Sequence, residues 1–251
     1  LRVLDFLDDS LSSGKIKHVG FSSHTEIDTF VDILDAYPKW EVVLTQMNYL
    51  DEYYQTGVMG LDELKRLNIG SMIMEPLRGG RLVQNIPPEV QKLWNGAEVK
   101  RTPVEWALEY LWNRDDVDCV LSGMNSLEQV RQNIQIASDV KEISEHDHDL
   151  IREVARTYKT LTGNDCTCCG YCMPCPEDVD IINCFKEYNI GKMLNNPKGS
   201  ALQYFTLIDD DCRADSCINC GECEFVCPQM LDIPQELEKV DEYFGREFNH
   251  F

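Results

Sequence analysis

The chain has 251 residues, of which 43% are hydrophobic, so it can bury a core and is too apolar for a disordered protein. Its formal net charge of −21 argues against binding to nucleic acid, which depends on Lys and Arg side chains. No apolar run approaches the roughly 20 residues that span a bilayer, and no signal peptide opens the sequence. We therefore expect a cytoplasmic protein with no membrane partner, whose acidity serves solubility or docking to a basic electron-transfer protein.

Short apolar segments alternate with amphipathic helices in the first 140 residues. The predicted strands are residues 16–21, 42–46, 71–74 and 118–122. The predicted helices are residues 26–36, capped by residues 22–25, then 60–68, one opened by Thr102-Pro103, and 126–137. This alternation predicts a parallel sheet covered by helices. A complete (β/α)₈ barrel takes roughly 250 residues, so four units predict the C-terminal half of a TIM barrel.

The opening of the chain fits this half-barrel interpretation. The sequence begins with Leu1, in what reads as the middle of an amphipathic helix, so we expect more protein upstream in the parent gene product. A half barrel exposes sheet edges and apolar surface, which favours self-association into a homo-oligomer. We place the barrel half at residues 1–142 and a linker helix with a cysteine-rich domain at residues 143–251.

The linker helix is predicted at residues 144–161. It opens on Glu145-His146-Asp147-His148-Asp149, which could hold a metal ion or could be a solvated, acidic first turn. We favour the solvated turn, because acidic side chains stabilise the N-terminus of a helix.

Eleven of the twelve cysteines lie between Cys166 and Cys227, which is typical of thiols kept for metal inside a cell. The second motif, Cys217-x2-Cys220-x2-Cys223-x3-Cys227-Pro228, has the spacing of bacterial two-cluster ferredoxins, in which the fourth cysteine binds the other cluster. The first motif, Cys166-x2-Cys169-x2-Cys172-x2-Cys175-Pro176, repeats it with one residue fewer before the last cysteine.

The repeat predicts two 4Fe–4S clusters in a mainly helical ferredoxin-like domain. One cluster would take Cys166, Cys169, Cys172 and Cys227, and the other would take Cys175, Cys217, Cys220 and Cys223. Structural zinc is the alternative, but a zinc site does not require three consecutive Cys-x2-Cys spacings that end in a Cys-Pro pair. Cys168 could substitute as a ligand, whereas Cys184 and Cys212 are more simply small buried groups.

Four segments in order resemble the aldo/keto reductase family, in the subgroup with a fused 4Fe–4S module. These segments are residues 14–24 (GKIKHVGFSSH), 46–49 (QMNY), 75–80 (EPLRGG) and 122–133 (SGMNSLEQVRQN). The resemblance covers nearly the whole chain and implies a TIM barrel that binds NAD(P)H at its C-terminal face.

The resemblance also implies a nucleotide site. Ser22, Ser23 and Gln46 would hold the nicotinamide carboxamide, with Met74 against the ring. The phosphates and adenosine would be held by Pro76, Leu77, Gly79, Gly123, Asn125, Gln132 and Asn133. Gln129 stands where many members have an Arg for the 2′-phosphate of NADP.

The function implied is NAD(P)H-dependent reduction of a small carbonyl or another redox substrate. The family's catalytic Asp, Tyr, Lys and His belong to the first half of the barrel, so no catalytic residue is named in this chain. The alternatives are a non-catalytic electron-transfer module with a scaffold barrel, and clusters that only stabilise the C-terminal domain.

Overall fold

The computed structural model describes residues 2–248, with side chains to residue 245, in two compact units. The first unit comprises the chain up to Gln84 together with Leu93–Ala155. The second comprises Asn85–Lys92 and the chain from Arg156 onward. Two helices, α4 (Pro88–Gly96) and α7 (Glu145–Thr160), contain residues of both units.

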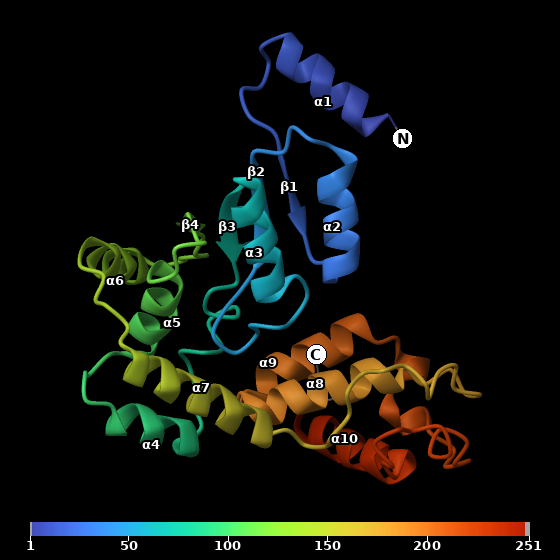
Figure 1. The fold of residues 1–251 in the computed structure, drawn as a ribbon. Coiled ribbons are helices and arrows are strands. Elements are labelled where there is room, and N and C mark those ends of the chain that lie inside the picture. The colour runs from blue at the N-terminus through green and yellow to red at the C-terminus, as the bar shows by residue number, and fades with distance from the viewer. Residues whose placement is uncertain (1, 249–251) are drawn as a thin grey trace. The chain divides into compact units, whose positions relative to one another are not determined.

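A parallel sheet of four strands in sequential order forms the centre of the first unit (Figure 1). The strands are β1 (Gly20–Ser23), β2 (Val42–Gln46), β3 (Gly70–Met74) and β4 (Cys119–Val120). Ser23 pairs with Thr45, and Gln46 pairs with Met74. Since every pair is parallel, the carboxyl ends of the strands meet at one edge. This confirms the predicted α/β fold with the topology of part of a TIM barrel.

A helix follows each strand of this unit, and one more precedes the first strand. The preceding helix is α1 (Val3–Ser12), and the others are α2 (Ile27–Ala36), α3 (Gly57–Leu67), α5 (Pro103–Trp112) and α6 (Leu127–Ser138). The apolar spacing buries Phe30 on α2 and Leu61 on α3, and these two helices pack side by side. Helix α5 begins as predicted, with Pro103 in its first turn and a capping box in which Thr102 and Glu105 bond reciprocally.

Two predicted boundaries were wrong. Strand β1 begins at Gly20 and not at Ile16. At Gly20 the backbone lies so close to β2 that a Cβ on this residue would be 2.2 Å from the Val42 carbonyl oxygen. No side chain of residues 22–25 caps α2: the cap position is Glu26, and the Ser23 hydroxyl instead accepts a bond from the Thr25 N–H at 3.1 Å.

A buried ion network joins α5 to the start of α7. Arg101 Nε lies 2.7 Å from Glu109 Oε2, and Arg101 Nη1 lies 3.3 Å from Asp147 Oδ2, with all three side chains at most 5% exposed. The guanidinium group also lies over the Trp106 ring at 4.5 Å. The first turn of α7 is therefore not wholly solvated, because Asp147 points into the protein and also accepts bonds from the Ser144 N–H and hydroxyl.

The second unit is helical, as predicted. Its elements are α8 (Ile181–Met193), α9 (Pro197–Leu207), the short 3₁₀ helices η1 (Asp210–Cys212) and η2 (Ala214–Ser216), and α10 (Ile233–Phe248). Its core packs α8 against α9 and α10, with Phe185 and Val240 fully buried and Tyr204 stacked on Phe244 at 4.3 Å. The cysteine-rich loops lie before α8 and before α10, so this small core supports both of them.

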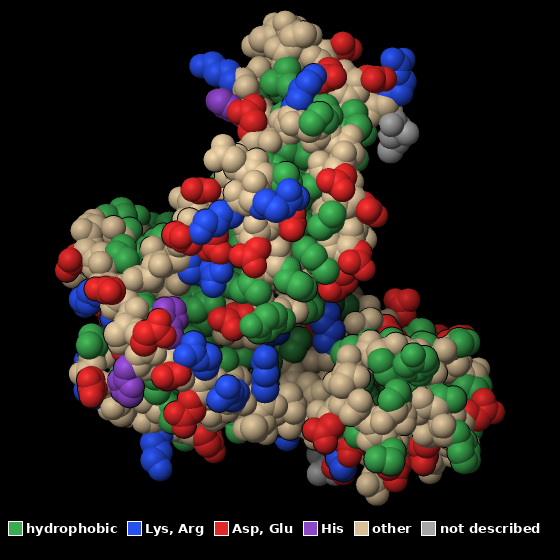
Figure 2. All heavy atoms as spheres, viewed as in Figure 1, with side chains coloured by type: hydrophobic (Ala, Val, Ile, Leu, Met, Phe, Trp, Pro, Cys, Tyr) green, Lys and Arg blue, Asp and Glu red, His purple; other side chains and the backbone are tan. Residues whose placement is uncertain are grey.

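The surface reflects the acidic composition. Figure 2 shows Asp and Glu side chains spread over the visible face and not gathered in a single patch. Among the described helices, none combines the length and apolar character that a membrane-spanning segment needs.

Candidate cluster and nucleotide sites

The two cysteine motifs adopt the same local backbone. Three pairs of equivalent positions have left-handed φ angles, namely Cys168 (56°) with Asn219 (57°), Gly170 (80°) with Gly221 (76°), and Asp178 (54°) with Met230 (54°). The turns that follow also match: the N–H of Met173 bonds to the Gly170 carbonyl, and the N–H of Glu224 bonds to the Gly221 carbonyl. The repeat seen in the sequence is therefore a repeat of structure.

The first cysteine cavity gathers thiols from both motifs. It is lined by Cys166, Cys168, Cys169, Cys172 and Cys227, and its volume is about 20 Å³. Burial raises the pKa of Cys172, and the neighbouring thiolates of its own motif and of Cys227 raise it further. These thiols lie close enough to repel one another once ionised, which is the arrangement that a bound cationic iron centre relieves.

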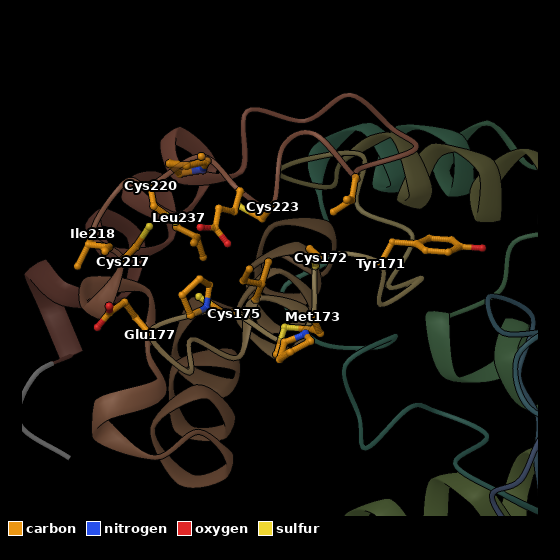
Figure 3. A pocket seen from close by; sticks show the side chains of 17 residues that line it. Tyr171, Cys172, Met173, Cys175, Glu177, Cys217, Ile218, Cys220, Cys223 and Leu237 are labelled. Atoms are coloured by element: carbon orange, nitrogen blue, oxygen red, sulfur yellow. The ribbon is translucent and has the colours of Figure 1, made fainter.

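The second cysteine cavity is larger, at about 200 Å³, and it also draws on both motifs (Figure 3). Its thiols belong to Cys172, Cys175, Cys217, Cys220 and Cys223. Burial raises the pKa of Cys223 to about 11, with added repulsion from the thiolates of Cys217 and Cys220. Tyr171 lies at the rim and points away from the labelled cysteines.

The donor chemistry of both cavities fits 4Fe–4S clusters, which take four Cys thiolates each. Cys227 lies with the first motif and Cys175 with the second, so the structure brings together the two sets that the sequence predicted. In the part of the chain that the structure describes, no three His, Cys, Asp or Glu side chains form a ready site for a single metal ion. Of the remaining cysteines, Cys184 is fully buried, as predicted, whereas Cys212 is half-buried and Cys119 is exposed.

A groove of about 690 Å³ lies at the carboxyl edge of the sheet, beside the ends of β3 and β4. Eight of the eleven predicted nucleotide residues line it, namely Met74, Pro76, Leu77, Gly79, Gly123, Asn125, Gln132 and Asn133. Ser22, Ser23 and Gln46 do not. They lie at the ends of β1 and β2, on the same sheet edge.

The wall of the groove is built from a loop and a helix N-terminus. Gly79 has a φ of +65°, and neither it nor Gly123 has any atom near the place of a missing Cβ, so both leave open space beside the backbone. Ser126 caps α6, and the Gln129 side chain accepts a bond from the Asn125 N–H at 2.9 Å. A helix N-terminus facing open space in this way can bind a phosphate group.

Gln46 is 2% exposed, and its Oε1 has no hydrogen-bond partner. Its Nε2 donates to Asp51 Oδ2 at 3.2 Å, which fixes the orientation of the amide. A buried acceptor without a partner costs free energy, so a ligand N–H at this position would stabilise the site. The nicotinamide carboxamide offers such an N–H, and Gln46 therefore fits the role that the resemblance implies.

The sequence analysis overlooked the partners of Gln46. Asp51 also accepts a bond from Asn48 Nδ2 at 2.9 Å and lies 3.2 Å from Arg78 Nε. Arg78 has a φ of +50°, in the loop after β3 that carries the groove residues. The sequence did contain an indication of these partners, because polar residues directly after a strand of a parallel sheet lie at the edge where ligands bind.

Comparisons with known proteins identify the family of each part of the chain. Residues 1–156 match the model of the aldo/keto reductase family, and residues 165–232 match the model of a 4Fe-4S dicluster domain. The solved structure of the aldo-keto reductase AKR11C1 from Bacillus halodurans in its holo form is 20% identical, with a TM-score of 0.49, over 59% of this chain and 53% of that one. For the apo form the values are 20%, 0.49, 59% and 54%. This chain thus spans about half the length of that reductase, and no curated protein matches it.

Proposed function

Because this chain belongs to the aldo/keto reductase family and continues into a 4Fe–4S dicluster domain, we propose that it is an iron–sulfur oxidoreductase that uses NAD(P)H. The proposed substrate is a small carbonyl compound or another small redox-active molecule, with an electron-transfer protein as a further partner. One observation carries the proposal: predicted nucleotide residues from two distant stretches, 74–79 and 123–133, line one groove.

In this proposal the residues of the groove, together with Gln46 on the same edge of the sheet, bind and orient the nucleotide. Gln46 Oε1 accepts a hydrogen bond from the carboxamide, and Met74 packs against the nicotinamide ring. Gly79 and the N-terminus of α6 take the phosphates, since both leave room beside backbone N–H groups. A bound nicotinamide supplies a hydride and iron–sulfur clusters pass single electrons.

The eight motif cysteines hold the clusters in the two sets already described. Eleven cysteines between residues 166 and 227 require a reducing compartment, so we propose a cytoplasmic location. No residue of this chain is assigned as the catalytic acid. A proton donor supplied from outside residues 1–251 completes the carbonyl reaction in this proposal.

An anaerobic titration with NADH and NADPH tests the proposal. We expect either nucleotide to bleach the brown absorbance of the reconstituted holoprotein, and the more effective one identifies the preferred cofactor. If neither bleaches it while dithionite still does, electrons enter from another partner and the chain is an electron carrier.

A matched pair of variants locates the nucleotide. Gln46→Leu removes the buried acceptor, and we expect it to weaken nucleotide binding about tenfold, the effect of one lost hydrogen bond. Gln135→Leu makes the same change at an exposed position of α6 outside the groove lining and should leave binding unchanged. Equal effects from the two variants would show that the nucleotide does not lie against Gln46.

A further inference from the structure

Five thiols line the first cysteine cavity, and four of them belong to the proposed ligand set of its cluster. The fifth belongs to Cys168, which lies between Cys166 and Cys169 in the loop. The Cys168 N–H lies 3.4 Å from Cys166 Sγ, so these two residues are already in contact. Cys168 is exposed, as is Cys169.

The second motif has no thiol at the position equivalent to Cys168. The equivalent residue there is Asn219, with a φ of 57° against 56° for Cys168. Asn is among the residues that best tolerate the left-handed region, whereas Cys has no such preference. The backbone thus explains Asn219 but not Cys168. The thiol of Cys168, in a residue that lines the cavity, offers a chemical reason for a cysteine at this position.

We propose that Cys168 is a spare ligand of the first cluster, able to replace Cys166. The exchange breaks the iron–sulfur bond to Cys166 and forms one to Cys168. The Cys168 thiol gives up its proton and the released Cys166 thiolate takes one up, so charge and oxidation state are conserved. This inference rests on the proposed cluster ligands but not on the nucleotide site.

The iron content of reconstituted variants tests the exchange. Wild type should hold about eight iron ions per chain, four in each of two clusters. Cys166→Ser should also hold about eight, because Cys168 takes over. The matched change in the second motif, Cys217→Ser, should drop to about four, because Asn219 offers no thiol. Cys217→Ser combined with Asn219→Cys should recover about eight.

Two further variants separate Cys168 from other replacements. Cys168→Asn keeps a residue suited to the left-handed backbone and should hold about eight iron ions. The double variant Cys166→Ser/Cys168→Asn should hold about four. Loss of half the iron in Cys166→Ser alone would overturn the proposal, and so would full iron in the double variant. If Cys217→Ser also kept about eight, the proposed ligand sets themselves would be wrong.

If Cys166→Ser does not fold, a kinetic measurement tests the same proposal. Iron release to a chelator is followed by absorbance in wild-type and Cys168→Asn holoproteins. A spare thiol that recaptures a partly released cluster should make the first half of the iron leave several-fold more slowly in wild type. Identical release rates would overturn the proposal.

Discussion

The buried pair of Arg101 and Glu109 gives the sharpest test of the forces that hold the first unit together. Both side chains are 1% exposed and 2.7 Å apart. Glu109→Gln keeps the volume but removes the charge, and it leaves the guanidinium buried with Asp147 at 3.3 Å and the Glu142 carbonyl at 2.7 Å.

Breaking a buried pair costs about 3–5 kcal/mol, and the partners that remain put this variant at about 3 kcal/mol. That is about a hundredfold loss in the folding equilibrium constant, and a fall in Tm of about 6–12 °C for a unit of this size. The assay is urea unfolding followed by tryptophan fluorescence. All four tryptophans (40, 94, 106 and 112) belong to the first unit, so the signal reports that unit alone.

Two comparisons make the result decisive. Asp115→Asn breaks an exposed pair with Lys65 and should leave the unfolding midpoint unchanged. Arg101→Met with Glu109→Leu and Asp147→Asn removes every charge of the network and should lie closer to wild type than Glu109→Gln. A loss below about 1 kcal/mol in Glu109→Gln would refute the view that the pair is isolated from water.

Three further predictions concern pH, nucleotide choice and assembly. Burial alone would raise the pKa of Asp147, but bonds from Ser144 and the charge of Arg101 outweigh burial and hold that pKa below its ordinary value. The stability from Asp147 is therefore present above about pH 4 and lost as pH falls through the lowered pKa, so Asp147→Asn should flatten the acid limb of a stability–pH curve. An acid limb as steep as that of wild type would contradict this. Gln129→Arg places a cation at the groove and should favour NADPH over NADH about fivefold in a binding titration, whereas an unchanged ratio would place the 2′-phosphate elsewhere. Residues 1–251 alone should elute from gel filtration as an oligomer, because β1 and β4 are sheet edges among the described strands, and a sharp compact monomer peak would refute this.

Local chemistry made much of the fold predictable. Strand β2 occupies the predicted residues, and Thr102 with Pro103 opens α5, because these features depend only on neighbours in the sequence. The start of helix α9 is harder to predict. Asn196 accepts a bond from the Gly199 N–H and Pro197 begins the helix, but the same residues would also suit a turn. Turns and helix caps use the same side-chain bonds, so the sequence does not separate them.

Features that join distant residues were harder to predict. Asp147 read as solvated because its partner Arg101 lies 46 positions earlier. The ion pair of Arg78 with Asp51 joins the loops after β3 and β2, which are adjacent only in the folded sheet. The grouping of the cysteines is the exception, since the spacing of the motifs specifies which thiols share a cavity.

The exchange of Cys175 and Cys227 between the two cavities has a consequence for how the cysteine-rich domain evolves and assembles. In the proposed ligand sets, each motif contributes three thiols to its own cluster and one to the cluster of its twin. Deletion of either motif, or loss of its fourth cysteine, would leave the cluster of the other motif one thiolate short. The duplicated loops thus behave as a single inherited unit, because each cluster depends on both of them.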